Sequence, residues 1–111
     1  MPNLSVNEND VPPTQFPDRW SKDLVGTEAL PTTSGFNLGR ACYTATEFGE
    51  PQIHADQEAV YVISGVGEVM VGDEVIALRP GVAFYVGPGV KHCARRTSEA
   101  PVQVVYTHGA I

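Results

Sequence analysis

The sequence predicts an all-β fold, a small barrel or sandwich built from short strands. No window keeps the i, i+3, i+4, i+7 apolar spacing of an amphipathic helix over three turns. Short apolar or alternating runs are instead separated by glycine- and proline-containing turns at intervals of about 8–12 residues, which is typical of small β-barrels. The 111 residues fit one domain, because a chain of this size buries roughly two thirds of its unfolded surface.

The expected strands start at residue 36 and continue almost to the C-terminus. Residues 36–46 alternate larger and smaller side chains before a break at Gly49-Glu50-Pro51. Residues 52–65 follow as a second extended stretch. The remaining expected strands, each bounded by turn residues, are 68–71, 75–78, 82–86 and 102–108.

Residues 1–20 are polar and contain four prolines. Proline cannot donate to a sheet ladder, so we expect residues 1–20 to form an extended arm and residues 21–111 to form the single barrel domain. Such an arm needs a surface, either on its own barrel or on a neighbouring copy. The apolar residues that could dock it are Trp20, Leu24, Val25 and Leu30.

Charge and composition narrow the classes of partner and location. Seven basic and thirteen acidic residues give a net charge of -6, which would repel a phosphate backbone, so we expect no nucleic-acid partner. No apolar run reaches the roughly 18 residues of a membrane span, and the N-terminus lacks the features of a signal peptide. Cys42 and Cys93 form no C-x-x-C pair and are expected to be free thiols. We therefore expect a cytoplasmic protein without membrane contact.

Two stretches carry residues that suit a metal ion. Gln52, His54 and Glu58 have the same parity, so on an extended strand they would share one face. His92 follows a second, glycine-bounded strand. These residues could be ordinary polar positions, but two imidazoles and a carboxylate inside an apolar barrel would be costly unless a cation satisfied them. Imidazole and carboxylate from separate strands also match the preference of transition metals.

The same stretches resemble the paired motifs of the cupin superfamily, G-x5-H-x-H-x3,4-E-x6-G and G-x5-P-x-G-x2-H-x3-N. The chain is similar to a small single-domain member of the Cupin_2 type, and the motifs with their linker cover about half of it. The matching positions are His54, Glu58, Gly65, Gly81, Gly89 and His92. The departures are Thr46 and Gln52 for the first Gly and His, Gly87 for Pro, and Arg96 for Asn.

The resemblance implies a double-stranded β-helix, or jelly roll, that holds one divalent metal through His54, Glu58 and His92. Gln52 could be a direct ligand, hold a metal-bound water, or hydrogen-bond Glu58. Iron is the metal we favour, because a carboxylate with two imidazoles suits non-haem iron, whereas manganese, nickel and zinc also accept such ligands. The resemblance further implies a homodimer.

Other residues are candidates for contact with a small molecule. Arg96 has the parity of His92, so it either points into the cavity and binds a carboxylate or lies on the surface beyond the end of the strand. Arg40 is a weaker case of the same kind. Tyr43 and Tyr106 are candidate lining residues, although a tyrosine on a small barrel is more often a packing residue. His108 is expected to be structural or exposed rather than catalytic.

Two functions follow from these assignments. The first is a metal-dependent enzyme of dioxygenase, isomerase or lyase type that acts on a small polar or anionic molecule, with Glu58 as a candidate catalytic base. The alternative is a non-catalytic cupin module that binds or senses a small molecule. We favour the enzyme.

Overall fold

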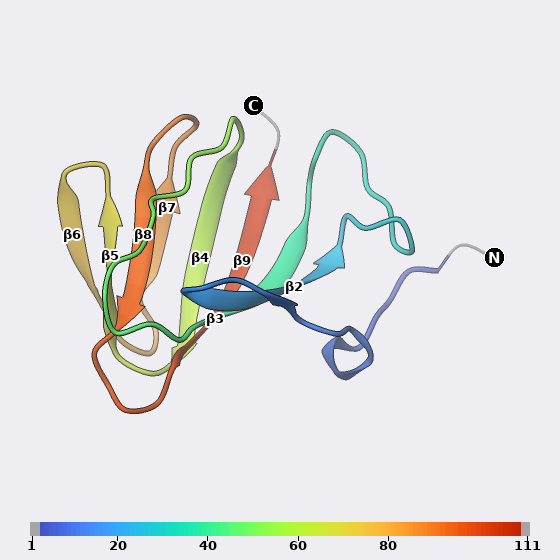
Figure 1. Ribbon diagram of the computed structural model, residues 1–111. Helices are drawn as coiled ribbons and strands as arrows, with labels where there is room; N and C mark the ends of the chain where they lie inside the picture. The colour runs from blue at the N-terminus through green and yellow to red at the C-terminus, as the bar shows by residue number, and fades with distance from the viewer. Residues whose placement is uncertain (1–2, 110–111) are drawn as a thin grey trace.

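The computed structural model describes residues 3–109, and these residues form an almost entirely β structure (Figure 1). Its elements are the single 3-10 turn η1 (Glu8–Asp10) and the strands β1 (Thr14–Gln15), β2 (Arg19–Val25), β3 (Leu38–Tyr43), β4 (Gln57–Ser64), β5 (Gly67–Val71), β6 (Glu74–Leu78), β7 (Ala83–Val86), β8 (His92–Arg96) and β9 (Val102–Gly109). The all-β prediction is confirmed. None of the helical segments in the described part of the chain could span a bilayer.

The strands form two antiparallel sheets. One sheet has the order β1-β2-β3-β9-β4-β7 and the other has the order β6-β5-β8. In Figure 1 the strands of the smaller sheet lie together on the left, and β4 and β9 of the larger sheet lie to their right. The last strand, β9, runs between β3 and β4, and the smaller sheet pairs β5 with β8. All three pairings join segments far apart in the sequence, as the predicted jelly roll requires.

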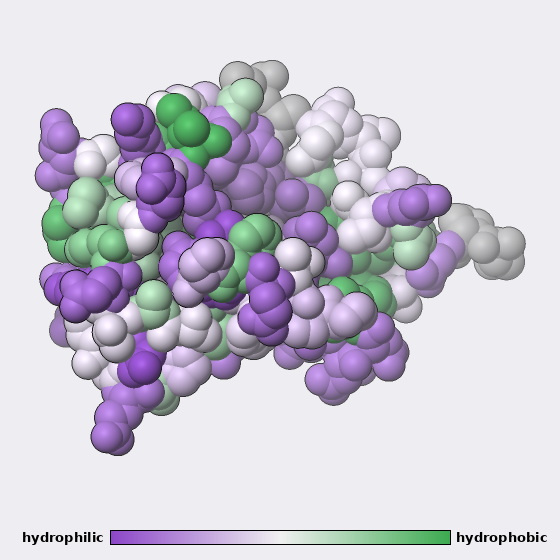
Figure 2. Space-filling model, in the orientation of Figure 1, coloured by the Kyte–Doolittle hydropathy of each residue, from purple (hydrophilic) through white to green (hydrophobic). Residues whose placement is uncertain are grey.

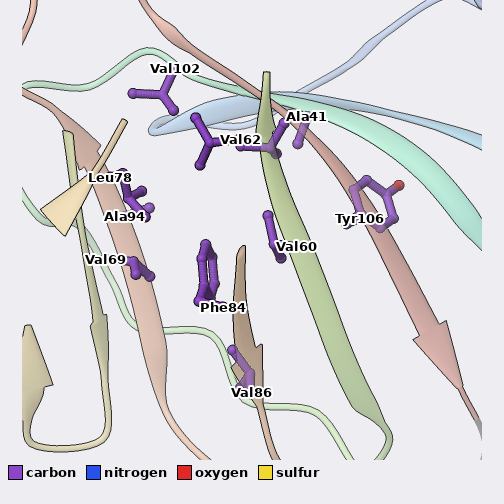
Figure 3. Packing of buried hydrophobic residues seen from close by; sticks show 11 residues of the cluster. Ala41, Val60, Val62, Val69, Leu78, Phe84, Val86, Ala94, Val102 and Tyr106 are labelled. Atoms are coloured by element: carbon purple, nitrogen blue, oxygen red, sulfur yellow. The ribbon is translucent and has the colours of Figure 1, made fainter. Parts of the chain in front are cut away.

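The apolar core lies between the two sheets. On β4, the buried residues Val60 and Val62 alternate with the exposed residues Ala59 and Tyr61, because successive side chains of a strand point to opposite faces. Figure 3 shows side chains from both sheets meeting in this space. The cluster consists of Ala41, Val60, Val62, Val69, Leu78, Phe84, Val86, Ala94, Val102, Val104 and Tyr106.

The prediction that one extended strand carries Gln52, His54 and Glu58 on one face is wrong. Gln52 forms an isolated bridge with His92, the first residue of β8, whereas β4 begins only at Gln57. Because β8 belongs to the smaller sheet and β4 to the larger one, the chain must cross between sheets over residues 53–56, and it bends at residues 55–56. The crossing, and not one continuous strand, therefore determines how Gln52 and His54 lie relative to Glu58.

The separate arm predicted over residues 1–20 is not confirmed. β2 begins at Arg19, which pairs with Tyr43 of β3, so the boundary after residue 20 falls inside a strand of the larger sheet. The polar turn η1 is attached to this sheet, since Lys22 donates to the carbonyl of Glu8 at 2.9 Å. The Glu8 carboxylate also lies 2.9 Å from Arg40 Nε.

Replacing Leu78 by alanine should test the two-sheet core. Leu78 is 1% exposed and packs between the sheets, so the Leu78→Ala variant should lose about 2–5 kcal/mol of unfolding free energy in urea. Val75 lies on the same strand but is 54% exposed, and Val75→Ala should change that free energy by no more than about 0.5 kcal/mol. Equal losses in the two variants would contradict this arrangement of β6.

Candidate metal centre

The carboxylate of Glu58 lies at the centre of a cluster that contains every histidine of the chain. Its Oε1 is 3.3 Å from His54 Nε2 and 3.4 Å from His92 Nε2, and its Oε2 is 3.2 Å from His108 Nε2. The Glu58 side chain is only 13% exposed. Three imidazoles therefore converge on one largely buried anionic group.

The three histidines come from different parts of the fold. His54 lies in the crossing segment before β4, and His92 is the first residue of β8. His108 lies on β9 directly opposite Glu58 in the β4–β9 ladder. Directly opposed residues of an antiparallel pair point to the same face, so this register alone brings His108 and Glu58 together.

The Nδ1 atom of each imidazole faces an oxygen acceptor, and that of His54 also lies 3.2 Å from the backbone carbonyl oxygen of Asp56. His54 Nδ1 lies 2.7 Å from Asp56 Oδ1, and His108 Nδ1 lies 3.1 Å from the same oxygen. His92 Nδ1 lies 3.1 Å from the carbonyl oxygen of Val90. An acceptor at Nδ1 favours a proton there, which leaves Nε2 as the atom that faces Glu58.

The charges of the cluster are strongly coupled. Burial would raise the pKa of Glu58, but hydrogen bonds from His108 and His92 outweigh it and lower that pKa to about 2. The hydrogen bond to Glu58, supported by Asp56, raises the pKa of His108 to about 9 against the effect of burial. Burial also opposes the rise in the pKa of His92, which Glu58 causes. The two carboxylates thus favour positive charge between the rings.

A divalent cation would supply that positive charge, and the donor set fits one. Ligand atoms of His54, Glu58 and His108 all lie within 4.8 Å of one another. Two imidazoles and a carboxylate oxygen are ligands that transition metals accept together. This group can hold a metal ion, and it includes a histidine that sequence reasoning assigned to a structural or exposed position. No local signal marked His108, because its place depends on the pairing of β9 with β4.

A cavity of about 170 Å³ lies next to the cluster. Of the sequence-predicted residues, Gln52, Glu58, His92, Tyr43 and Tyr106 line it. Polar residues that sequence reasoning missed also line it: Asp18, Arg19, Ser21, Asp23 and Asn37. Arg19, Ser21 and Asp23 alternate along β2 and so share one face of that strand, but Lys22 between them is also polar, so the sequence carries no clear period-two signal.

The two arginines predicted to bind substrate are not among the described residues that line this cavity. Arg96 donates through Nε to the carbonyl oxygen of Thr44 at 2.8 Å and through Nη1 to that of Ser98 at 2.8 Å. Arg40 has the opposite parity to the core residue Ala41, and its guanidinium binds Glu8. Both guanidinium groups are therefore engaged elsewhere in the fold.

Tyr106 is held in the cavity wall by a close fit. Its ring lies against Gly39, its partner across β3 and β9, where a Cβ atom would overlap the ring. Its hydroxyl donates to Asp23, and burial together with Asp23 raises the pKa of Tyr106.

The face shown in Figure 2 is hollowed near its centre, and mainly hydrophilic residues surround the hollow.

Comparison with known proteins places the sequence in a family. The model of the "Cupin domain" family matches residues 40–108, more than half of the chain. No curated protein matches the sequence.

Solved structures share the fold at low sequence identity. An RmlC-like cupin from Shewanella frigidimarina is 17% identical with a TM-score of 0.74, and the match covers 97% of this chain and 90% of that one. Oxalate decarboxylase from Bacillus subtilis is 16% identical with a TM-score of 0.81, but this chain, 99% covered, spans only 30% of it. The polyketide cyclase RemF from Streptomyces resistomycificus is 16% identical with a TM-score of 0.77, covering 96% and 78% of the two chains. With its two-sheet jelly roll and its match to the family model, the chain belongs to the cupin family.

Proposed function

We propose that this cupin is a metal-dependent enzyme that acts on a small polar molecule bound beside the His54, Glu58 and His108 group. The observation that carries the proposal is the convergence of all three imidazoles on the largely buried Glu58 carboxylate. An uncompensated carboxylate at such a position would be costly. In this proposal His92 is a further ligand, and Gln52 lies in the adjoining cavity wall.

A bound divalent ion, for which iron remains our prediction and manganese, nickel or zinc the alternatives, would supply Lewis acidity or reactivity with oxygen. The chain's own groups would bind and orient the substrate. Glu58 is our candidate base, and the hydrogen bonds that lower its pKa to about 2 keep it ionised but make it a weak proton acceptor, so it would take a proton only when its imidazole partners are drawn away. Tyr106 cannot readily release its proton, so its hydroxyl would position rather than deprotonate a ligand.

The size and lining of the cavity indicate the class of substrate. A volume of about 170 Å³ suits a small molecule. Of the described residues, Arg19 is the one lysine or arginine that lines the cavity, and its guanidinium lies 2.8 Å from Asp18. An anionic group of a substrate would therefore meet Arg19, in place of Arg96 and Arg40 as first predicted. The names of two similar structures, a decarboxylase and a cyclase, support catalysis without indicating the reaction.

Metal analysis tests this proposal directly. Protein purified without an affinity tag or chelator should contain near one equivalent of a transition metal, measured by inductively coupled plasma mass spectrometry. Replacing His54 or His108 by alanine should weaken metal retention at least about 10-fold, since even the loss of a ligand's hydrogen-bond partner costs about 10–100-fold. The exposed neighbour Lys91 offers a control, and Lys91→Ala should keep its metal.

Two outcomes would count against the enzyme. Metal retention that is unchanged in both histidine variants would remove the proposed site. The second outcome starts from a parent protein that binds metal. If the parent and its Glu58→Gln variant bind small molecules equally tightly and neither turns them over, the non-catalytic binding module is favoured.

A second experiment asks whether His108 replaces the imidazole missing at position 52. The backbones of Gln52 and His92 exchange hydrogen bonds of 2.8 and 3.0 Å, and both residues line the cavity, so a histidine at position 52 would stand beside His92. We therefore expect Gln52→His to restore metal retention in the His108→Ala background and to add little in the parent. A chelator titration of the four proteins measures this. If Gln52→His tightens metal retention in the parent background but does not restore it in the His108→Ala background, then Gln52, and not His108, occupies the missing ligand position.

The homodimer, the cytoplasmic location and the lack of nucleic-acid binding remain predictions. The outer face of the larger sheet carries exposed apolar side chains that a second copy could cover, among them Tyr61, Ile63 and Tyr85. Light scattering of the purified protein would give its mass in solution.

A further inference from the structure

We propose that Asp56 is a positioning residue that holds His54 and His108 together, so that both present Nε2 to the same point. This inference rests on the proposed metal site. Asp56 Oδ1 lies 2.7 Å from His54 Nδ1 and 3.1 Å from His108 Nδ1, and Oδ2 lies 3.2 Å from His108 Nδ1. One carboxylate thus contacts two imidazoles on the side away from Glu58.

The crossing between the sheets places Asp56 in this position. Asp56 lies in the bend at residues 55–56, immediately before β4, and its side chain is 35% exposed. His54 is two residues away in the sequence, whereas His108 is on β9. The two rings lie 4.7 Å apart between centroids. Asp56 therefore links a ligand on an irregular segment to a ligand on a regular strand.

His92 offers an internal comparison. Its Nδ1 faces a backbone carbonyl, that of Val90 at 3.1 Å, which no side-chain substitution removes. His54 Nδ1 also lies 3.2 Å from the backbone carbonyl oxygen of Asp56, so a change of the Asp56 side chain should affect the orientation and tautomer of His108 most, those of His54 less, and those of His92 not at all. A general loosening of the fold would instead affect all three rings.

The link also accounts for how a histidine outside the family motif can take part. The pairing of β4 with β9 brings His108 opposite Glu58, but a histidine ring can still turn about its side-chain bonds. A carboxylate that accepts from Nδ1 fixes both the ring orientation and the tautomer of a ligating histidine. Asp56 does this for His108 and for His54 at once.

The experiment compares Asp56→Asn and Asp56→Ala with the parent protein. Cobalt(II) is titrated into metal-free protein at fixed pH, and affinity is taken from visible absorption and chelator competition. We expect either substitution to weaken cobalt binding about 10–100-fold. Asp73 lies exposed in the turn between β5 and β6, so Asp73→Asn is the matched control and should bind cobalt as the parent does.

Two further readouts separate positioning from a general effect. In the His108→Ala background, Asp56→Ala should cost less than in the parent, because one of the two rings that it holds is gone. Imidazole nitrogen resonances of the metal-free protein should change most for His108, less for His54 and not for His92 in Asp56→Asn. Urea unfolding confirms that each variant is folded.

The outcomes keep this inference distinct from the proposed function. If the parent binds no cobalt, the proposed metal site fails, and the nitrogen resonances still decide whether Asp56 holds the two rings. If the parent binds cobalt but Asp56→Asn matches it in affinity and in all three imidazole spectra, the positioning role is overturned. Equal changes at His92 would also overturn it.

Discussion

The pairing of Glu58 with His108 across β4 and β9 is the contact on which the rest of the site depends. A carboxylate that faces the space between two sheets loses most of its hydration, and only partners of opposite charge or good hydrogen-bond donors compensate for that loss. The β4–β9 register supplies one such partner. His54 and His92 supply the others from the crossing segment and from the smaller sheet, so the charge of Glu58 is shared by three elements.

The two sheets meet at this point because the chain changes sheets there. Gln52 pairs with the start of β8, and five residues later the chain has joined β4. The irregular backbone between them lets His54 and Asp56 approach the same cluster from positions that a regular strand would not provide. The core residues farther along β4, Val60 and Val62, anchor that strand against the smaller sheet and keep Glu58 in place. The site is therefore built on the β4–β9 strand pair and completed by the crossing segment and the start of β8.

The cavity beside the cluster combines polar groups from β2 with aromatic side chains from β3 and β9. Asp23 binds the hydroxyl of Tyr106, and the lack of a side chain at Gly39 makes room for the Tyr106 ring. These contacts shape the wall without using the histidines. The cavity wall thus includes residues outside the histidine cluster, and proteins similar in fold carry names that describe different reactions.

The sequence by itself determined the all-β class, most strand positions and three members of the cluster, His54, Glu58 and His92. Strand periodicity, turn residues and motif spacing are local properties, so they can be read along the chain. Only the tertiary structure decided that His108 meets Glu58, that Asp56 contacts two imidazoles, and that Arg40 and Arg96 are engaged away from the cavity. These facts depend on which strands pair, in what register, and where the chain crosses between sheets. Such long-range pairing is set by packing of the whole core and leaves no signal in the residues nearby.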